Sequence, residues 1–160
     1  MSSSEEFVTG SCLCKAVTYK AVGAPMFKTL CHCYNCRKAS GAPIMGSSVY
    51  LMNQVVFTGK EHIKIHEDSA TDSGQPYRRH FCGRCGSQIG GQSATHEQFF
   101  AVNQGSLDKE FVNEWEPLAE QYCQTKAGFL PPLVAKGGEH QFTGRYVRHM
   151  LGARVEDQAA

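Results

Sequence analysis

Alternation of apolar and polar residues is the clearest pattern in this chain, and a period of two predicts β-strands. Across residues 16–22, Val17, Tyr19 and Ala21 fall on one side of such a strand, and mostly polar neighbours fall on the other. We expect further strands at residues 27–31, 44–51, 55–58, 77–82 and 99–103.

A seventh strand and the few helical signals complete the pattern. Residues 61–67 place Ile63 and Ile65 inward and their charged or histidine neighbours outward. Helix signals are poor, and only short helical turns are expected near residues 37–40 and 107–111. The pattern therefore predicts a mainly β fold of antiparallel strands joined by short loops.

The length of the chain is that of one ordinary domain, at 160 residues. Because no repeat, low-complexity segment or domain boundary is evident, we predict a single domain over residues 1–160. Its core is expected between about residues 7 and 150, with short loose tails at both ends. No apolar run approaches the roughly 20 residues of a membrane-spanning helix, so no membrane is expected as a partner.

The net charge and the first residues of the chain bear on its expected partners and cellular location. The formal net charge is only +1, whereas nucleic-acid-binding proteins usually carry a clear basic excess, so no nucleic acid is expected as a partner. The first six residues are polar and acidic, unlike a secretory signal. We therefore expect a cytoplasmic, reducing location, where clustered cysteines bind metal more often than they form disulfides.

Seven of the eight cysteines fall into three clusters. The clusters are a C-x-C, Cys12 and Cys14, a C-x-C-x-x-C, Cys31, Cys33 and Cys36, and a C-x-x-C, Cys82 and Cys85. A C-x-x-C lets both thiolates face one ion, and Gly83 and Gly86 are expected to supply the positive φ that such turns often need. The remaining Cys123 is expected to be a small buried residue, with a role near a metal as the less favoured alternative.

Counting ligands divides the seven cysteines into two sites. A structural zinc takes four protein ligands, and a catalytic zinc takes three and keeps one position open. Cys31, Cys33 and Cys36 can wrap one ion and leave that position to water or a substrate thiol, while the other four form a closed site. Spacing alone also permits a zinc ribbon of Cys33, Cys36, Cys82 and Cys85, which leaves three cysteines over.

Three segments carry a resemblance to a known family: residues 10–17, GSCLCKAV, residues 31–41, CHCYNCRKASG, and residues 80–86, HFCGRCG. In order, spacing and flanking residues they resemble the glutathione-dependent formaldehyde-activating enzymes, a family that includes centromere protein V. The agreement extends from about residue 10 to about residue 108. Beyond about residue 111 the chain departs from the commoner bacterial pattern, and residues 130–133, LPPL, look more like fungal members.

The resemblance implies a fold and two metal sites. The implied fold is a β-tent of small antiparallel sheets built around zinc, similar to that of a small zinc-binding Rab exchange factor. The implied structural zinc ligands are Cys12, Cys14, Cys82 and Cys85, and the implied catalytic zinc ligands are Cys31, Cys33 and Cys36. We expect two Zn²⁺ ions per chain, with the three-cysteine site partly empty because an open three-thiolate site loses zinc during purification.

The resemblance also implies a reaction. It predicts a zinc-dependent carbon–sulfur lyase, or the reverse adduct-forming enzyme, acting on a glutathione S-adduct such as S-hydroxymethylglutathione or a larger conjugate, including one of specialised metabolism. Glutathione is then the substrate or co-substrate, and the partner is a small-molecule thiol adduct. Because one fold supports several functions, a non-catalytic zinc-binding module is the alternative. The oligomeric state is left open, a homodimer included.

Four residues near the three-cysteine cluster are candidates for supporting roles. His32 lies between two expected ligands and either serves as a hydrogen-bond donor or proton carrier or faces solvent. Arg37 either binds a glutathione carboxylate or is a solvated residue at a helix start. Asn35 and Ser40 are expected to line the open position and bind substrate.

Overall fold

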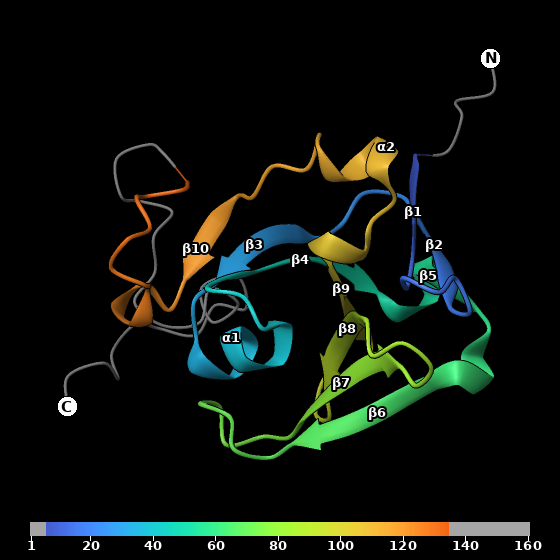
Figure 1. Ribbon diagram of the computed structural model, residues 1–160, viewed down its shortest axis with the longest axis horizontal. Coiled ribbons are helices and arrows are strands. Elements are labelled where there is room, and N and C mark those ends of the chain that lie inside the picture. The colour runs from blue at the N-terminus through green and yellow to red at the C-terminus, as the bar shows by residue number, and fades with distance from the viewer. Residues whose placement is uncertain (1–5, 135–160) are drawn as a thin grey trace. The chain divides into compact units, whose positions relative to one another are not determined.

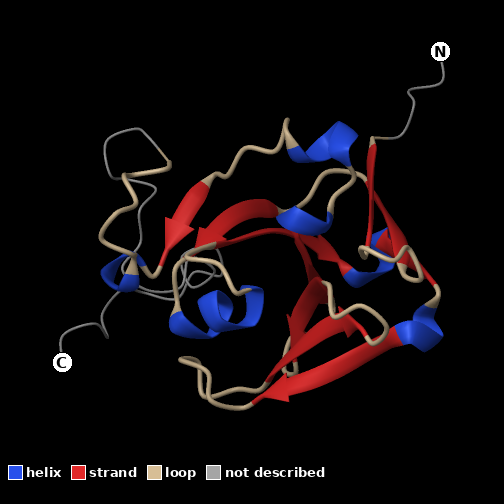
Figure 2. Cartoon of the chain, in the orientation of Figure 1, coloured by secondary structure: helices blue, strands red, loops and turns tan. Residues whose placement is uncertain are grey.

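The computed structural model describes residues 6–134, which are drawn in colour in Figures 1 and 2. These residues form two units, one of residues 6–28 and 46–116 and one of residues 29–45 and 117–134. Strands dominate and the helices are short (Figure 2), which confirms the mainly β fold. The single domain expected over the whole chain stays a prediction, and each unit is described by itself.

A three-stranded antiparallel sheet forms one layer of the first unit. Its strands are β1 (Phe7–Ser11), β2 (Thr18–Val22) and β5 (Val55–Thr58), in that order. Val17, Tyr19 and Ala21 are buried, as the alternation predicts. The strand β1 was not predicted, because its sequence Phe-Val-Thr-Gly-Ser does not alternate cleanly.

A second antiparallel arrangement in the first unit runs in the order β4, β9, β8, β7, β6. These strands are β4 (Met45–Leu51), β9 (Phe99–Asn103), β8 (Gln88–Ser93), β7 (Tyr77–Cys82) and β6 (Ile63–Asp68). The inward placement expected for Ile65 is wrong, because that side chain is 55% exposed. The strand β6 lies at the sheet edge, four of its six residues are exposed, and Ile63 is only half-buried.

The core of the first unit joins its two sheets through aromatic side chains. The Phe57 ring of β5 lies 5.9 Å from the Tyr19 ring of β2 and 5.3 Å from the Phe100 ring of β9, centroid to centroid. Cys12 and Cys82 belong to the same buried cluster. Two candidate metal ligands are therefore held in the core itself.

Short helical turns connect the strands of the first unit. They are the 3₁₀ turns η1 (Met52–Gln54), η2 (Lys60–His62) and η3 (Gln104–Ser106), and the helix α2 (Lys109–Val112). The turn predicted at residues 107–111 corresponds to α2, which begins after Asp108. The Asp108 backbone N–H donates to the carbonyl of Thr9 at 3.0 Å, so this turn is fastened to β1.

The second unit contains β3 (Phe27–Cys31), α1 (Tyr34–Ser40), β10 (Ala119–Gln121) and η4 (Cys123–Thr125). The strands β3 and β10 pair in parallel, with Leu30 opposite Glu120. This parallel pair departs from the antiparallel pattern expected. It is possible because residues 32–118 form a long connection between the two strands, and parallel strands need such a connection.

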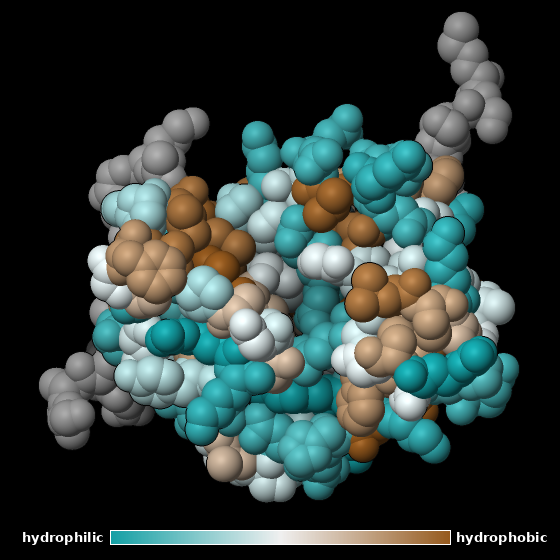
Figure 3. Space-filling view, in the orientation of Figure 1, coloured by the Kyte–Doolittle hydropathy of each residue, from teal (hydrophilic) through white to brown (hydrophobic). Residues whose placement is uncertain are grey.

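Apolar side chains remain exposed on the second unit. Leu118 and Phe129 are among the exposed large apolar residues. Figure 3 shows apolar residues, coloured brown, gathered over the region of β10. Among residues 6–134, no helix is long and apolar enough to cross a membrane.

We predict that the close packing at Gly10 is essential to the first unit. A Cβ at Gly10 would overlap the Tyr19 hydroxyl and the backbone carbonyl of Ser106. Gly10→Ala should therefore lower the free energy of unfolding by about 1–3 kcal/mol or more, measured by denaturant titration of metal-saturated protein.

The matched control is Gly105→Ala, because a Cβ at Gly105 meets nothing within 4 Å. That variant should stay within about 0.5 kcal/mol of the unchanged protein. Equal stabilities for the two variants would contradict the packing described at Gly10.

Candidate metal centres

Four cysteines of the first unit converge on one point. Cys12 and Cys14 follow β1, Cys82 ends β7, and Cys85 lies in the turn after it. The four sulfur atoms all lie within 4.8 Å of one another. The Sγ atom of Cys14 is 3.6 Å from that of Cys12 and 3.8 Å from that of Cys82. A tetrahedral zinc with Zn–S bonds of about 2.3 Å needs sulfur atoms about 3.8 Å apart, so the donor set fits zinc.

Tight turns bring these sulfurs together. The Gly86 N–H donates to the Cys82 carbonyl at 2.8 Å, and Gly86 has φ of 77°, which favours glycine. The positive φ expected at Gly83 is wrong, because only Gly86 of the pair adopts it. A Cβ at Gly83 would instead lie 2.7 Å from Cγ of Lys64, so that glycine serves close packing.

The hydrogen bonds around Cys85 favour its thiolate. The Ser87 hydroxyl, 3.2 Å from Sγ, and the backbone N–H groups of Ser87 and Cys14 lower the pKa of Cys85 to about 5. A thiolate is the form that binds metal, so Cys85 is suited to be a ligand.

Three cysteines of the second unit form the other cluster. Cys31 ends β3, Cys33 is the N-cap of α1, and Cys36 lies in the first turns of that helix. Their sulfur atoms lie within 4.8 Å of one another. The Cys36 N–H donates to Sγ of Cys33 at 3.3 Å, so the same thiol caps the helix and faces the cluster. Cys31 is buried, whereas Cys33 and Cys36, both beside or on α1, are half-buried.

The sulfur atoms of this cluster are so close that their thiolates would repel one another. The neighbouring Cys33 and Cys36 sulfurs, followed by burial, raise the pKa of Cys31 far above its ordinary value. A divalent cation among the sulfurs would offset the repulsion between thiolates. Three ligands would leave one coordination position open, which is the arrangement of catalytic zinc sites.

The structure thus forms the four-plus-three grouping of cysteines within the residues it describes. It does not form the zinc ribbon that spacing alone permits. All eight cysteines lie in the described part of the chain, and none of them forms a disulfide. The identity and number of bound metals stay predictions.

His32 is completely buried and does not face solvent. Its Nε2 lies 2.9 Å from Oε1 of Glu120, a carboxylate that is also completely buried. Glu120 further accepts from Nζ of Lys126 at 2.7 Å. Burial alone would raise the pKa of Glu120, but the hydrogen bonds from Lys126, His32 and two backbone N–H groups outweigh it and lower that pKa to about 2.

The other candidate residues have partners within the fold. The Arg37 guanidinium donates to the Thr125 carbonyl at 3.0 Å and lies 5.6 Å from the Tyr34 ring centroid. The Ser40 hydroxyl donates to the Cys36 carbonyl at 2.9 Å, at the end of α1. Asn35 is half-buried in the first turn of α1. Substrate contacts by Arg37, Asn35 and Ser40 stay predictions.

Cys123 is half-buried rather than fully buried, and its sulfur lies 3.7 Å from the Glu120 carbonyl. Glu120 itself was missed by sequence reasoning. The signal that could have found it is a single charge between the small apolar Ala119 and the polar Gln121, beside the apolar Leu118. The four groups that donate to Glu120 belong to His32, Lys126, Leu133 and Val134. No sequence pattern links these residues to Glu120, so the sequence alone does not predict the contacts.

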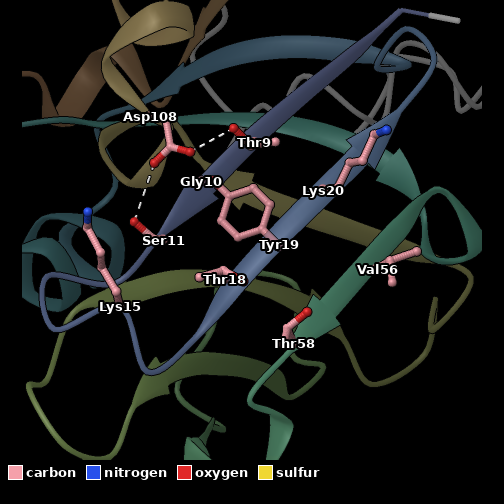
Figure 4. A pocket seen from close by; sticks show the side chains of 10 residues that line it. All are labelled: Thr9, Gly10, Ser11, Lys15, Thr18, Tyr19, Lys20, Val56, Thr58 and Asp108. Atoms are coloured by element: carbon pink, nitrogen blue, oxygen red, sulfur yellow. Dashed lines mark hydrogen bonds between the residues drawn. The ribbon is translucent and has the colours of Figure 1, made fainter.

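A polar pocket of about 410 Å³ also lies on the first unit (Figure 4). Its lining consists of Thr9, Gly10, Ser11, Lys15, Thr18, Tyr19, Lys20, Val56, Thr58 and Asp108. The Asp108 carboxylate accepts from the Thr9 hydroxyl at 2.7 Å and from the Ser11 hydroxyl at 3.4 Å (Figure 4). No cysteine lines this pocket, so it is not part of either metal centre.

Comparisons with known proteins match most of the described chain. The family model described as glutathione-dependent formaldehyde-activating enzyme matches residues 7–125. An uncharacterized lyase of Schizosaccharomyces pombe is 28% identical over 107 residues, which are 66% of this chain and 65% of that protein. The chain therefore spans less than two thirds of the length of that relative.

A crystal structure of a Rhodobacter sphaeroides protein is also similar to this chain. The sequence identity is 20% and the TM-score is 0.49. The match covers 63% of this chain and 88% of that one.

Removing one ligand from each cluster should give different results. Cys33→Ser should lower bound zinc from about two ions per chain to about one while the fold persists, because the three-cysteine cluster is local in the sequence. Cys82→Ser should also cost one zinc but unfold the first unit, because Cys82 lies in its core. Elemental analysis and circular dichroism measure both effects. Loss of both metals and of the fold in Cys33→Ser would contradict the grouping.

Proposed function

The chain belongs to the glutathione-dependent formaldehyde-activating enzyme family, and from this premise we propose that it is a zinc-dependent carbon–sulfur lyase acting on a glutathione S-adduct. S-hydroxymethylglutathione or a larger conjugate is the substrate class. The name of the Schizosaccharomyces pombe relative, a lyase, supports the reaction type. The thiol ligands require a reducing compartment, and we propose the cytoplasm.

One observation carries the proposal: three thiols, and not four, converge in the second unit within the described residues. Cys31, Cys33 and Cys36 would hold the zinc, and the remaining position would take the substrate. When bound there, zinc supplies a Lewis acid that stabilises the glutathione sulfur as a thiolate. A closed four-thiolate site offers no such position, so the cluster of Cys12, Cys14, Cys82 and Cys85 is assigned to structure.

The chain's own residues define how substrate reaches the site. Cys31 is buried at the end of β3, so approach from that side is blocked. Cys33 and Cys36 are half-buried on α1, so the adduct approaches over this helix. Asn35 and Arg37 are on the same helix and are the proposed contacts for the glutathione part.

The reaction needs no oxidant or reductant. In the lyase direction the carbon–sulfur bond breaks and its electron pair stays with sulfur. The adduct hydroxyl loses its proton as the carbonyl of the aldehyde forms, and a proton returns to sulfur on release of glutathione. The reverse sequence forms the adduct, so either direction uses the same site.

The test is release of free thiol from a panel of glutathione S-conjugates, S-hydroxymethylglutathione included, by zinc-loaded protein. We expect turnover of at least one conjugate. Cys36→Ser should lower kcat/KM by more than about a hundredfold, because loss of a metal ligand should exceed the 10–100-fold cost of changing a residue behind the ligands.

The matched control is Cys123→Ser, which removes a thiol outside both clusters and should keep most of the activity. Full activity in Cys36→Ser would show that the three-cysteine cluster is not the working site. No turnover of any conjugate by protein with both metals bound would favour the non-catalytic zinc-binding module.

A further inference from the structure

We propose that Glu120 is a positioning residue for the three-cysteine site, which holds the turn from Cys31 to Cys33 in its ligand geometry through His32. The inference rests on the proposed function, which assigns this cluster as the working site. It adds that the cluster is not built by β3 and α1 alone. The chain from β10 to residue 134 completes it.

Three atoms of His32 form hydrogen bonds with residues 120–125. Its N–H donates to the Gln121 carbonyl at 3.1 Å, and its carbonyl accepts from the Thr125 hydroxyl at 3.0 Å. Its Nε2 lies 2.9 Å from Oε1 of Glu120. Backbone and ring are thus both held by residues 120–125. Because His32 stands between two of the three thiols, any movement of it moves both neighbouring ligands.

The direction of the ring hydrogen bond follows from chemistry. An ionised carboxylate only accepts, and the pKa of Glu120 is lowered to about 2, so Nε2 of His32 carries the hydrogen. The other ring nitrogen, Nδ1, is buried without a hydrogen-bond partner among the described residues. Within this part of the chain, Glu120 is therefore the polar group that orients the imidazole.

Glu120 is itself immobilised at both oxygens. Oε1 accepts from His32 and from Nζ of Lys126, at 2.9 and 2.7 Å. Oε2 accepts from the backbone N–H groups of Leu133 and Val134, at 3.0 and 3.2 Å. A completely buried charge is tolerated only with such partners. The four donors fix the position of the carboxylate, which is what a positioning residue requires.

The contacts of Glu120 and Gln121 bear on the geometry of the metal ligands. A metal site tolerates distance errors of only about 0.2 Å at its ligands. Cys31 is also paired across the parallel ladder with Gln121, the residue next to Glu120. The strand β10 therefore fixes the position of Cys31 through strand pairing. Through His32, the same strand also fixes the positions of Cys31 and Cys33.

The principal test is Glu120→Gln in the full chain, loaded with Co²⁺ in place of zinc. The amide keeps one acceptor oxygen and places an NH₂ group where the other oxygen accepts, so two of the four donors lose their acceptor and the side chain is no longer fixed at both ends, at nearly constant volume. We expect one of the two Co²⁺ ions to bind about 10–100-fold more weakly, with a changed visible d–d spectrum. The four-cysteine site contains no residue of this network and serves as the internal reference.

Glu116→Gln is the matched control, since it removes the same charge from an exposed side chain that precedes β10 in the sequence. It should leave both affinities and the spectrum unchanged. A folded Glu120→Gln protein with unchanged Co²⁺ affinities and spectrum would overturn the proposal.

Thr125→Val gives a second test in case Glu120→Gln does not fold. It keeps the side-chain shape and removes the hydroxyl that donates to His32 and to the Tyr122 carbonyl. The expected result is a smaller loss of Co²⁺ affinity with a spectral change at the same site. Where Glu120→Gln does not fold, unchanged affinity and spectrum in Thr125→Val would overturn the proposal.

The spectra also separate this inference from the proposed function. Altered Co²⁺ binding in Glu120→Gln, together with an unchanged protein that turns over no conjugate, would support the positioning role and contradict the lyase. Turnover by the unchanged protein, together with unchanged Co²⁺ spectra in both variants, would contradict the positioning role alone.

Discussion

Repulsion between neighbouring thiolates is the constraint on which this structure depends. Seven sulfur atoms lie in two groups whose members are within 4.8 Å of one another. Such groups cannot all ionise without a cation, as the strongly raised pKa of Cys31 illustrates. A bound metal removes this cost and ties the chain together at the same point, so metal binding and folding are coupled.

The two groups have different consequences because they are built differently. The four-cysteine group joins the chain after β1 to the end of β7, and two of its members lie in the core of the first unit. Its closed ligand set has no room for a substrate. The three-cysteine group comes from one strand end and one helix start, and two of its thiols are half-buried. Partial exposure and an incomplete ligand set are the grounds on which we propose it as the site of chemistry.

The hydrogen bonds that hold His32 beside the three-cysteine group involve a buried charged residue, which is unusual. Glu120, His32 and Lys126 form ion pairs and hydrogen bonds at a location where apolar side chains would pack without such costs. Buried polar networks of this kind are retained where they fix one geometry. For this chain, that geometry is the turn carrying Cys31 and Cys33.

Sequence predicted the local features of the fold and of the sites. Strands at residues 27–31, 55–58, 77–82 and 99–103 were predicted with the bounds observed, because alternation is a local signal. The three cysteine clusters were recognised because ligand spacing in metal knuckles is equally local. Joining Cys12 and Cys14 to Cys82 and Cys85 rested instead on the ligand count and on the family resemblance. The strand β8 was missed because Gly90 and Gly91 interrupt any β pattern.

Features that depend on distant partners were not predictable in this way. The exposure of Ile65 depends on β6 being an edge strand, which is a property of the sheet and not of the segment. The parallel pairing of β10 with β3 and the burial of Glu120 depend on residues about ninety positions apart. Only the folded structure brings these groups together.

The central claim is that a sulfur substrate completes the three-cysteine site. X-ray absorption spectroscopy at the zinc edge of protein holding two zinc ions tests it most directly. The account predicts an average of about three and a half sulfur ligands per zinc without substrate, rising to about four when glutathione is added. An average that is already four without glutathione, or that does not rise when glutathione is bound, would contradict it.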